Sequence, residues 1–395
     1  MSPDFFEWIE KHISDDPSRL RLKYGRQRAG EILQIEMRRK HISKFGDILK
    51  DNPRFIFPNS LSAEQSTSWR LAEFHASLIG EGTTIADLTA GLGMDTMAFA
   101  RKAAKVVAVE RNEEVADALR HNSNESGNIE IITCDCREKV KEWAKSDVHF
   151  DVVFIDPARR DASGGRIFRL SESEPDVIAM FDDLREITGK IIVKASPMLD
   201  ISSTVAELNA VGAGVCQVIA LSTPTECKEL DLECEPRRNT EPPVIRAVTI
   251  GAEVFSDLEF TRKEEENATA NYGIPAVGDY IFDPYPSIMK AGAFKLLGER
   301  YGLSKLGSNT HLWFSNEPET DFPGAVFKVV EIVPYMSKHI KRYSSRFPRV
   351  GVTTRNFDIS SDTLRAKLKV AEGPLRLFAV TAYNGQKLLI TCEKI

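Results

Sequence analysis

The sequence predicts an α/β fold built around a parallel sheet, and two observations support this prediction. Apolar strands alternate with helices throughout residues 84–197. Acidic residues stand at or near four of the strand ends, namely Asp87, Glu110, Asp135 and Asp156. Strands that alternate with helices form parallel sheets, whose ligands lie at the carboxyl ends of the strands. Because an ionised carboxylate is costly to bury, the four acids indicate a polar ligand along that edge of the sheet.

The first strand and the turn after it form the most informative segment, residues 84–93 (TIADLTAGLG). The turn contains Thr89, Gly91 and Gly93 and opens a helix, and the next strand, KVVAVE, ends at Glu110. In such a unit the glycines let backbone N–H groups approach a ligand closely, and the acid accepts both hydroxyls of a ribose. The segment therefore predicts a site for a cofactor that contains a nucleoside.

Two details favour S-adenosylmethionine over a dinucleotide. Asp87 lies on the strand before the turn, where it can meet an amino-acid ammonium directly or through water. The third glycine of the dinucleotide pattern G-x-G-x-x-G is Thr96 in this chain. The alternative is a glycine turn that only joins a strand to a helix. The acids at the later strand ends argue against that alternative.

The other elements of this region follow from apolar periodicity. We expect helices over residues 115–122, 138–144 and 175–185, and strands IEIITCD (129–135), FDVVFID (150–156) and KIIVKASP (190–197). Two more apolar runs, VCQVIALS (215–222) and VIRAVTIG (244–251), are expected to close the sheet as an antiparallel pair.

These motifs resemble the class I S-adenosylmethionine-dependent methyltransferases, over residues 60–252. The resemblance implies a Rossmann-like, seven-stranded core. It also implies that Glu110 holds the ribose, that Asp135 lies beside the adenine amine and that Asp156-Pro157 faces the methyl group. The segment SAEQSTSWRLAEFHA looks like the family's entry helix, so that Gln65, Ser66 and Thr67 would cap the methionine end. Ordinary helix capping is the alternative for these three residues.

The fourth-strand motif departs from the family's common pattern. Enzymes of this family that methylate exocyclic amines carry Asn/Asp/Ser-Pro-Pro-aromatic, whereas this chain reads Asp156-Pro157-Ala158-Arg159-Arg160, without the aromatic. We expect Asp156 to accept a hydrogen bond from the acceptor or to act as its base. Arg159 and Arg160 are expected to grip a phosphate or to stack on a base. Solvated arginines in a loop are the alternative.

A second comparison concerns the methylated atom. The RNA 5-methyluridine enzymes have a similar Asp-Pro-Pro-Arg motif but need a cysteine nucleophile after the fifth strand. In this chain that position reads Lys194-Ala195-Ser196-Pro197. The sequence therefore favours transfer to a nitrogen or an oxygen over transfer to a ring carbon, with Lys194 as a weaker candidate for a site residue.

Composition and charge bound the remaining possibilities. The chain has 395 residues, 42% of them hydrophobic, and no apolar run long enough to cross a membrane. Its N-terminus carries acids where a signal peptide would be basic and then apolar, and its six cysteines lack the spacing of a zinc site. We therefore expect a cytoplasmic protein with reduced thiols, without a bound metal and without a membrane partner.

The net charge of −6 is unevenly distributed. Residues 1–60 hold 12 Lys/Arg and 9 Asp/Glu, a balance of +3, and residues 328–395 hold 13 and 5, a balance of +8. The rest of the chain therefore carries −6 − 3 − 8 = −17. A basic module beside an acidic core indicates a part that binds a polyanion, with ordinary solvated surface charge as the alternative.

Three segments surround the predicted core. Residues 1–59 have apolar positions at helical spacing and are expected to be helical. Residues 253–325 contain IMKAGAF and resemble the ferredoxin-like domain of a group of bacterial methyltransferases. Residues 326–395 contain TTRNF, LRAKLKV and a hairpin at Asn384-Gly385, and are similar to the THUMP-like domain of the same group.

Together these features predict an S-adenosylmethionine-dependent methyltransferase that acts on a structured RNA such as tRNA or rRNA. Two alternatives remain at this point. A non-catalytic RNA-binding protein that retains the fold is consistent with the missing aromatic after Pro157. A nicotinamide-dependent oxidoreductase shares the first two motifs but not the entry segment or the motif at Asp156. The sequence leaves the oligomeric state open.

Overall fold

The computed structural model describes residues 3–158, 169–236, 241–251 and 254–395. The chain divides into two compact units. The first contains residues 1–216 and 231–241, and the second contains residues 217–230 and 242–395. Each unit is described by itself.

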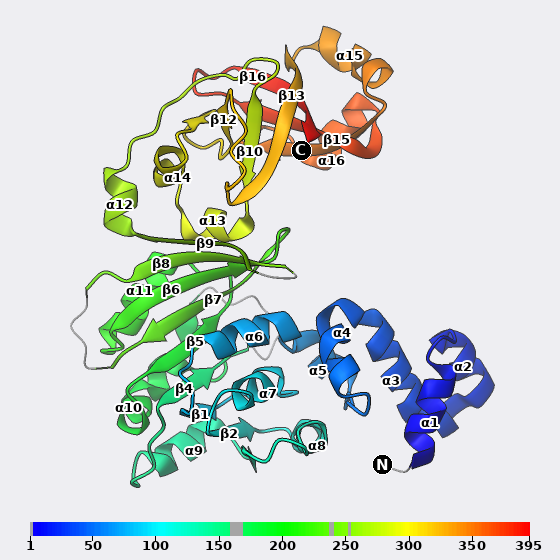
Figure 1. Ribbon diagram of the computed structural model, residues 1–395, viewed down its shortest axis with the longest axis vertical. Coiled ribbons are helices and arrows are strands. Elements are labelled where there is room, and N and C mark those ends of the chain that lie inside the picture. Colours follow the sequence, from blue (N-terminus) through cyan, green and yellow to red (C-terminus); the bar gives the residue numbers. More distant parts are fainter. Residues whose placement is uncertain (1–2, 159–168, 237–240, 252–253) are drawn as a thin grey trace. The chain divides into compact units, whose positions relative to one another are not determined.

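Five parallel strands form the part of the main sheet that lies in the first unit, in the order β3-β2-β1-β4-β5. The strands are β1 (Thr84–Asp87), β2 (Lys105–Glu110), β3 (Ile129–Thr133), β4 (Val152–Ile155) and β5 (Ile191–Ala195). The helices between and after them are α7 (Met94–Ala100), α8 (Glu113–Asn122), α9 (Cys136–Trp143), α10 (Val177–Ile187) and α11 (Ile201–Ala210). The predicted alternation of strands and helices is therefore confirmed (Figure 1).

The sheet has nine strands in all, in the order β3-β2-β1-β4-β5-β7-β6-β8-β9. The additional strands are β6 (Val215–Ser222), β7 (Cys227–Cys234), β8 (Val244–Ile250) and β9 (Val254–Thr261). Seven of these strands, β1 to β6 and β8, correspond to the strands that the sequence predicts. Strands β8 and β9 pair antiparallel with each other.

The predicted closing pair was wrong. The segments 215–222 and 244–251 form β6 and β8, which pair parallel rather than antiparallel. The sequence prediction missed β7, which follows β6 after only four residues, and a connection that short permits only an antiparallel neighbour. Its sequence, CKELDLEC, was overlooked because four of its eight residues are charged. Glu229 and Asp231 on this strand are nevertheless buried.

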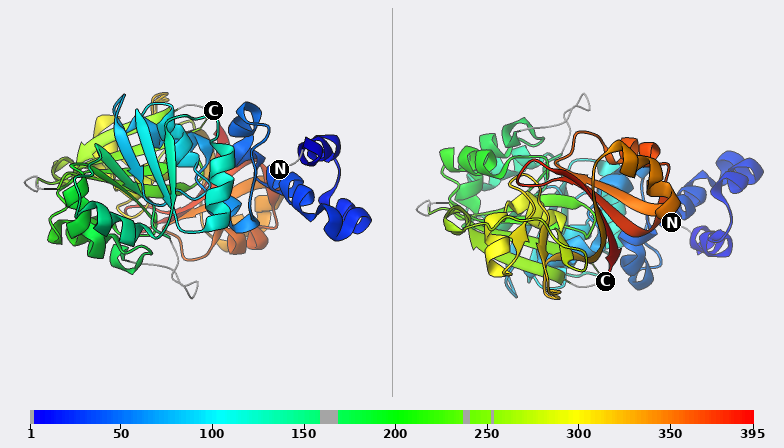
Figure 2. Two further views of the ribbon diagram at one scale, coloured as in Figure 1. Left: turned by 90° about the horizontal axis from the view of Figure 1, so that it is seen from below. Right: turned by 90° about the horizontal axis from the view of Figure 1, so that it is seen from above.

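Short helices precede the sheet and confirm the helical prediction for the N-terminal residues that the structure describes. They are α1 (Pro3–His12), α2 (Pro17–Tyr24), the 3₁₀ turn Gly25–Arg28, α3 (Ala29–Lys40), α4 (Ile42–Asp51), α5 (Ser60–Gln65) and α6 (Trp69–Ser77) (Figure 2). Phe45, Phe55 and Phe57 pack ring against ring and join one hydrophobic core with α6, α7 and strands β1 and β4. This core fixes α6 and α7 against the sheet.

The second unit contains a separate seven-stranded sheet in the order β11-β12-β10-β13-β16-β15-β14. Its strands are β10 (Tyr280–Pro284), β11 (Ser304–Lys305), β12 (Trp313–Ser315), β13 (Gly324–Pro334), β14 (Arg349–Arg355), β15 (Ala371–Thr381) and β16 (Lys387–Lys394). Its helices are α12 (Arg262–Asn267), α13 (Pro286–Ala291), α14 (Lys295–Arg300), α15 (Ser337–Arg346) and α16 (Ser361–Leu368). The hairpin predicted at Asn384-Gly385 joins β15 and β16, and Gly385 has the positive φ of +82° that such a turn favours.

Helices α15 and α16 pack on this second sheet through a small apolar core. Tyr343 of α15 and Leu364 and Leu368 of α16 are buried with Val350 and Leu377 of the strands. Tyr343 also shares a hydrogen bond of 2.7 Å with the hydroxyl of Thr391. Lys338, Lys341 and Arg342 of α15 and Lys367 of α16 are exposed. None of the helices in the described parts of the chain has the length and apolar character needed to cross a membrane.

Candidate cofactor and acceptor site

Glu110, at the end of β2, is held by two backbone N–H groups, one on each carboxylate oxygen. Gly91 N donates to Oε2 at 2.9 Å, and Asn112 N donates to Oε1 at 2.7 Å. Each oxygen is therefore fixed in place and retains capacity to accept one more hydrogen bond. This geometry matches a carboxylate that accepts the two neighbouring hydroxyls of a ribose.

The two glycines of the first turn are required for different reasons. Gly91 and Gly93 both have positive φ, +54° and +81°, where side chains are strained. A Cβ on Gly93 would also lie 2.0 Å from the Cδ1 of Leu119, whereas a Cβ on Gly91 would meet nothing nearer than the carbonyl of Thr89 at 4.0 Å. Gly93 thus permits close packing on α8, and Gly91 borders open space.

Asp87 ends β1 and is 1% exposed. Its carboxylate accepts a hydrogen bond from the hydroxyl of Thr96 at 2.6 Å and one from the N–H of Thr89 at 3.3 Å. Burial raises the pKa of Asp87 to about 7, although the hydrogen bond from Thr96 opposes this rise. Thr96, which replaces the third glycine of the dinucleotide pattern, therefore serves as the partner of this acid.

Asp135 has a structural partner of its own. It is the N-cap of α9, where its Oδ1 accepts from the backbone N–H of Arg137 at 2.8 Å. The Arg137 guanidinium also pairs with its Oδ2 at 2.5 Å, and this pairing lowers the pKa of Asp135. Any contact with an adenine amine would be shared with Arg137.

The entry segment places Thr67 inside the site. Thr67 is buried, and its hydroxyl donates to Asp95 Oδ2 at 2.7 Å. Gln65 is exposed at the end of α5, and the hydroxyl of Ser66 donates to the carbonyl of Thr67 at 3.3 Å. The N-cap position of α6 belongs to Ser68, which makes no side-chain cap hydrogen bond. Of the three predicted residues, Thr67 is thus the one joined to the buried network.

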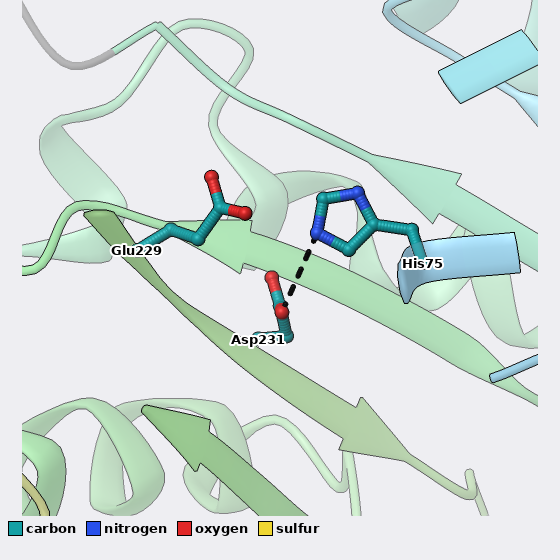
Figure 3. Close-up of side chains that lie close together, drawn as sticks. All are labelled: His75, Glu229 and Asp231. Atoms are coloured by element: carbon teal, nitrogen blue, oxygen red, sulfur yellow. Dashed lines mark ion pairs between the residues drawn. The ribbon is translucent and has the colours of Figure 1, made fainter. Parts of the chain in front are cut away.

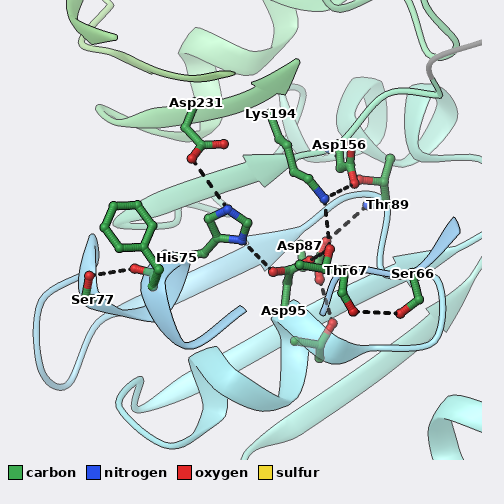
Figure 4. Close-up of polar contacts among 12 residues, drawn as sticks. Ser66, Thr67, His75, Ser77, Asp87, Thr89, Asp95, Asp156, Lys194 and Asp231 are labelled. Carbon is green, nitrogen blue, oxygen red and sulfur yellow. Dashed lines mark hydrogen bonds and ion pairs between the residues drawn. The ribbon is translucent and has the colours of Figure 1, made fainter. Parts of the chain in front are cut away.

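Asp95 connects Thr67 to a buried histidine. His75 Nδ1 lies 2.7 Å from Asp95 Oδ1, and its Nε2 lies 3.5 Å from Oδ2 of Asp231 on β7 (Figures 3 and 4). Burial by itself would lower the pKa of His75, but the carboxylates of Asp231 and Asp95 raise it well above its usual value. The ring of His75 is therefore held between two carboxylates that favour its protonated form.

Asp156 follows β4 and lies at the other end of the same network. Its Oδ2 is 2.5 Å from the ammonium of Lys194, and Lys194 also donates to the hydroxyl of Thr67 at 2.8 Å (Figure 4). The backbone N–H of Asp156 donates to the hydroxyl of Thr89 at 2.7 Å. Pro157 is buried beside it, while Arg159 and Arg160 lie outside the residues that the structure describes.

The structure links Thr89 directly to Asp87 and Asp156, and Lys194 links Asp156 to Thr67. It also shows four partners that sequence reasoning missed or underrated. Asp95 and His75 belong to no recognised sequence motif. Both are polar residues on the buried faces of short helices. Lys194 is the charged residue of an otherwise apolar strand, and this contrast was the sequence feature that indicated a site residue. Asp231 was missed together with its strand.

These residues fit S-adenosylmethionine by the chemistry of their donors and acceptors. A fixed carboxylate at Glu110 suits the ribose, and the carboxyl of Asp87 together with the hydroxyl of Thr67 suits an amino-acid end. Asp87 and Glu110 end β1 and β2, and Thr67 lies between α5 and α6. The acceptor motif at Asp156 follows β4, the next strand beside β1.

Comparison with known proteins supports the same cofactor. Family models match residues 69–164 (conserved hypothetical protein 95), 280–323 (ferredoxin-like domain) and 324–394 (THUMP domain-like). Two Mycobacterium tuberculosis proteins, from strains CDC 1551 / Oshkosh and ATCC 25618 / H37Rv, are named S-adenosylmethionine-dependent methyltransferases. Each is 22% identical over 360 residues, which span 89% of this chain and 92% of its own. The Aliivibrio fischeri 23S rRNA (uracil(1939)-C(5))-methyltransferase RlmD is 28% identical over 108 residues, 27% of this chain and 23% of its own.

A solved structure matches nearly the whole chain. It is the crystal structure of a predicted methyltransferase from Porphyromonas gingivalis W83, with a TM-score of 0.85 and 30% sequence identity. The match covers 99% of this chain and 97% of that one. The chain therefore belongs to the class I S-adenosylmethionine-dependent methyltransferases that carry a ferredoxin-like and a C-terminal THUMP-like domain, and S-adenosylmethionine is its cofactor.

Proposed function

We propose that this methyltransferase modifies a nitrogen or an oxygen of a structured RNA such as tRNA or rRNA. The observation that carries the proposal is the carboxylate of Asp156, which follows β4 and is held by Lys194 at 2.5 Å. Bound S-adenosylmethionine supplies the electrophilic methyl group. An amine or hydroxyl acceptor must lose a proton when it is methylated, and Asp156 is the group that we assign to receive it.

The protein's main contribution is positioning. Glu110, Asp87 and Thr67 hold the cofactor's ribose and amino-acid ends, and Asp156 orients the acceptor. Fixing two reactants in line replaces a bimolecular encounter and lowers the barrier by several kcal/mol. Arg159 and Arg160 remain our candidates for binding a phosphate or a base of the substrate.

The residues after β5 support nitrogen or oxygen as the acceptor. Carbon methylation of a uracil ring needs a nucleophile that first adds to the ring, and a cysteine after the fifth strand supplies it. Here β5 is followed by Ser196-Pro197, and the next cysteine is Cys216 on β6. The partial similarity to RlmD supports an RNA substrate without supporting that enzyme's C5 chemistry.

The RNA part of the proposal draws its main support from a basic surface on helices α15 and α16. We define the α15–α16 basic surface as Lys338, Lys341, Arg342, Lys367 and Lys369, all of which are exposed. Of the four Lys and Arg residues of α15, Lys338, Lys341 and Arg342 have no acidic partner among the residues that the structure describes, whereas Arg346 pairs with Glu331. Unpaired cations on one surface suit a run of phosphates.

The experiment that tests the proposed chemistry replaces Asp156 with alanine. The substrate probe is total RNA from cells that lack the gene, and the readout is incorporation of tritiated methyl groups. We expect Asp156→Ala to abolish transfer while calorimetry shows S-adenosylmethionine affinity within about threefold of the parent. Asp147→Ala, which removes an exposed acid, is the control and should retain full transfer. An Asp156→Ala variant with most of its turnover intact would refute the role of this residue.

A further inference from the structure

Lys194 is the cation that joins the acceptor motif to the entry segment. It extends from the buried strand β5, and its ammonium contacts Asp156 Oδ2 at 2.5 Å and Thr67 Oγ1 at 2.8 Å (Figure 4). Thr67 in turn donates to Asp95, whose other oxygen pairs with His75. A chain of hydrogen bonds therefore runs from the carboxylate of Asp156 to the buried ring of His75.

Stability alone does not account for a lysine at this position. The Lys194 side chain is only 2% exposed, and that of its partner Asp156 is 26% exposed. Removing an ammonium from water is costly, and replacing a buried ion pair with apolar residues is often neutral or stabilising. The other positions of β5 are filled by Ile191, Ile192, Val193 and Ala195. A charge kept in such a strand points to a role in the site.

The charges that face Asp156 explain what that role is. Among the described residues, Asp87 from β1 is an acid that interacts electrostatically with Asp156, and Lys194 from β5 is the cation hydrogen-bonded to it. Asp95 from α7 interacts with Lys194 and His75, and Asp231 from β7 lies on the far side of His75. A charge-assisted hydrogen bond from a cation fixes the direction in which a carboxylate points. Lys194 is the cation in contact with Asp156.

We propose that Lys194 is a positioning residue that holds the carboxylate of Asp156 aimed at the acceptor. Because Lys194 also grips Thr67, the acceptor carboxylate is tied to the segment that we assign to the cofactor's methionine end. The part of this inference that concerns the acceptor rests on the proposed function, whereas the electrostatic effect of Lys194 on position 156 does not.

A cysteine at position 156 reports that effect without any substrate. In Asp156→Cys, the rate of alkylation by iodoacetamide is followed against pH, and peptide mass spectrometry separates this thiol from the six native cysteines. We expect a thiol pKa below the ordinary value of about 8.5, because Lys194 stabilises the thiolate. Adding Lys194→Met should raise that pKa by about one unit or more.

The matched control is Lys190→Met in the same Asp156→Cys background. Lys190 directly precedes β5, pairs with Glu233 at 2.8 Å and contacts the carbonyl of Leu78 rather than Asp156. Its loss should leave the pKa of the thiol unchanged. If Lys194→Met does not fold, Lys194→Gln keeps a hydrogen-bond donor for Thr67 and removes only the charge, and the same shift is expected.

The second readout is the rate of methyl transfer to total RNA from cells that lack the gene. With Lys194→Gln, kcat should fall by about tenfold or more while the KM for RNA stays within about threefold, because the Asp156 carboxylate is then no longer held toward the acceptor. A parent enzyme that methylates no RNA would refute the proposed function, while the cysteine reporter would still measure the effect of Lys194. A folded Lys194 variant with an unchanged thiol pKa would overturn the inference about Lys194.

Discussion

At the scale of single residues, the carboxylate of Glu110 is the group that we assign to the cofactor's ribose. Its two oxygens are fixed by Gly91 N and Asn112 N, so a ribose bound there would meet a preorganised acceptor. Glu110→Ala should weaken S-adenosylmethionine binding by about 2–3 kcal/mol, because charge-assisted hydrogen bonds are lost. Titration calorimetry measures this, with Glu114→Ala on the exposed face of α8 as the control. Unchanged affinity in a folded Glu110→Ala protein would remove the ribose assignment.

Asp87 makes stability depend on pH in a predictable direction. Its pKa is about 7 in the folded protein, because of burial, against about 3.9 in an unfolded chain. A raised folded pKa means that its contribution to stability is fully present below about pH 4 and is lost as the pH rises through 7. Between pH 5 and pH 8 the parent should therefore lose about 2–3 kcal/mol of unfolding free energy relative to Asp87→Asn.

Denaturant unfolding of both proteins, without cofactor, at pH 5 and pH 8 measures this difference. The comparison between variant and parent isolates Asp87 from His75, whose raised pKa makes its own contribution fall with rising pH in both proteins. Asp147→Asn serves as the control for an exposed acid. Parallel pH dependences of Asp87→Asn and the parent would contradict a pKa near 7 for Asp87.

At the scale of elements, the turn between β1 and α7 depends on Gly93. Gly93→Ala introduces strain from its φ of +81° and a Cβ 2.0 Å from the buried Leu119. Gly82→Ala is a matched control, because Gly82 has a φ of +72° and nothing within 4 Å of its Cβ position. We expect Gly82→Ala to cost about 1–2 kcal/mol from backbone strain alone.

Gly93→Ala should cost clearly more than its control, by about 1–3 kcal/mol, because overpacking is added to strain. Thermal or denaturant unfolding measures both variants. The double variant Gly93→Ala with Leu119→Ala tests the contact, because part of the overpacking penalty should disappear when Leu119 is shortened. Equal destabilisation by Gly82→Ala and Gly93→Ala would show that the approach to Leu119 has no energetic role.

Helix α15 provides the test of RNA binding. Reversing Lys338, Lys341 and Arg342 to glutamate should weaken RNA binding by about tenfold or more, since each lost phosphate contact costs on the order of 1 kcal/mol. Cofactor affinity should not change. Filter binding with total RNA at several salt concentrations measures the effect, and the variant's salt dependence should be shallower.

The control is a triple reversal with the same change in net charge at scattered exposed positions. Lys141, Lys145 and Lys263 are suitable, because all three are exposed and lie outside the α15–α16 basic surface. Their reversal should weaken RNA binding much less. If the α15 triple variant binds RNA as the parent does at physiological salt, this module serves another partner and the RNA proposal loses its main support.

For the molecule as a whole, the sequence predicted the elements whose pattern is local. Apolar runs such as Lys105–Glu110 and Ile191–Ala195, and the hairpin at Asn384-Gly385, carry their signal within a few residues. Strand β7 was missed because a segment with so many charged residues is typical of a loop. One of its acids, Asp231, is buried beside His75 in the folded protein. The parallel pairing of β6 with β8 is a long-range choice that neither strand's sequence encodes by itself.

In the candidate site, too, the residues with a local sequence pattern were predicted and those that depend on long-range contacts were not. Glu110, Asp87 and Asp156 were predicted because strand ends in a parallel sheet gather at one edge. The contacts that join Asp95, His75 and Lys194 into a network were not predicted. His75 and Asp95 are 20 positions apart in the sequence, and Lys194 and Thr67 are 127 positions apart. Residue types alone do not reveal such pairs, which form only when the chain is folded.

The central claim is methyl transfer to an RNA, and the profile of modified nucleosides in cellular RNA tests it most directly. RNA from cells with and without the gene is hydrolysed and its methylated nucleosides are quantified by mass spectrometry. We predict that one N- or O-methylated nucleoside disappears in the deletion, returns with the parent gene and does not return with Asp156→Ala. Identical profiles with and without the gene would contradict an RNA substrate, and loss of a C5-methylated uridine would contradict the assigned acceptor chemistry.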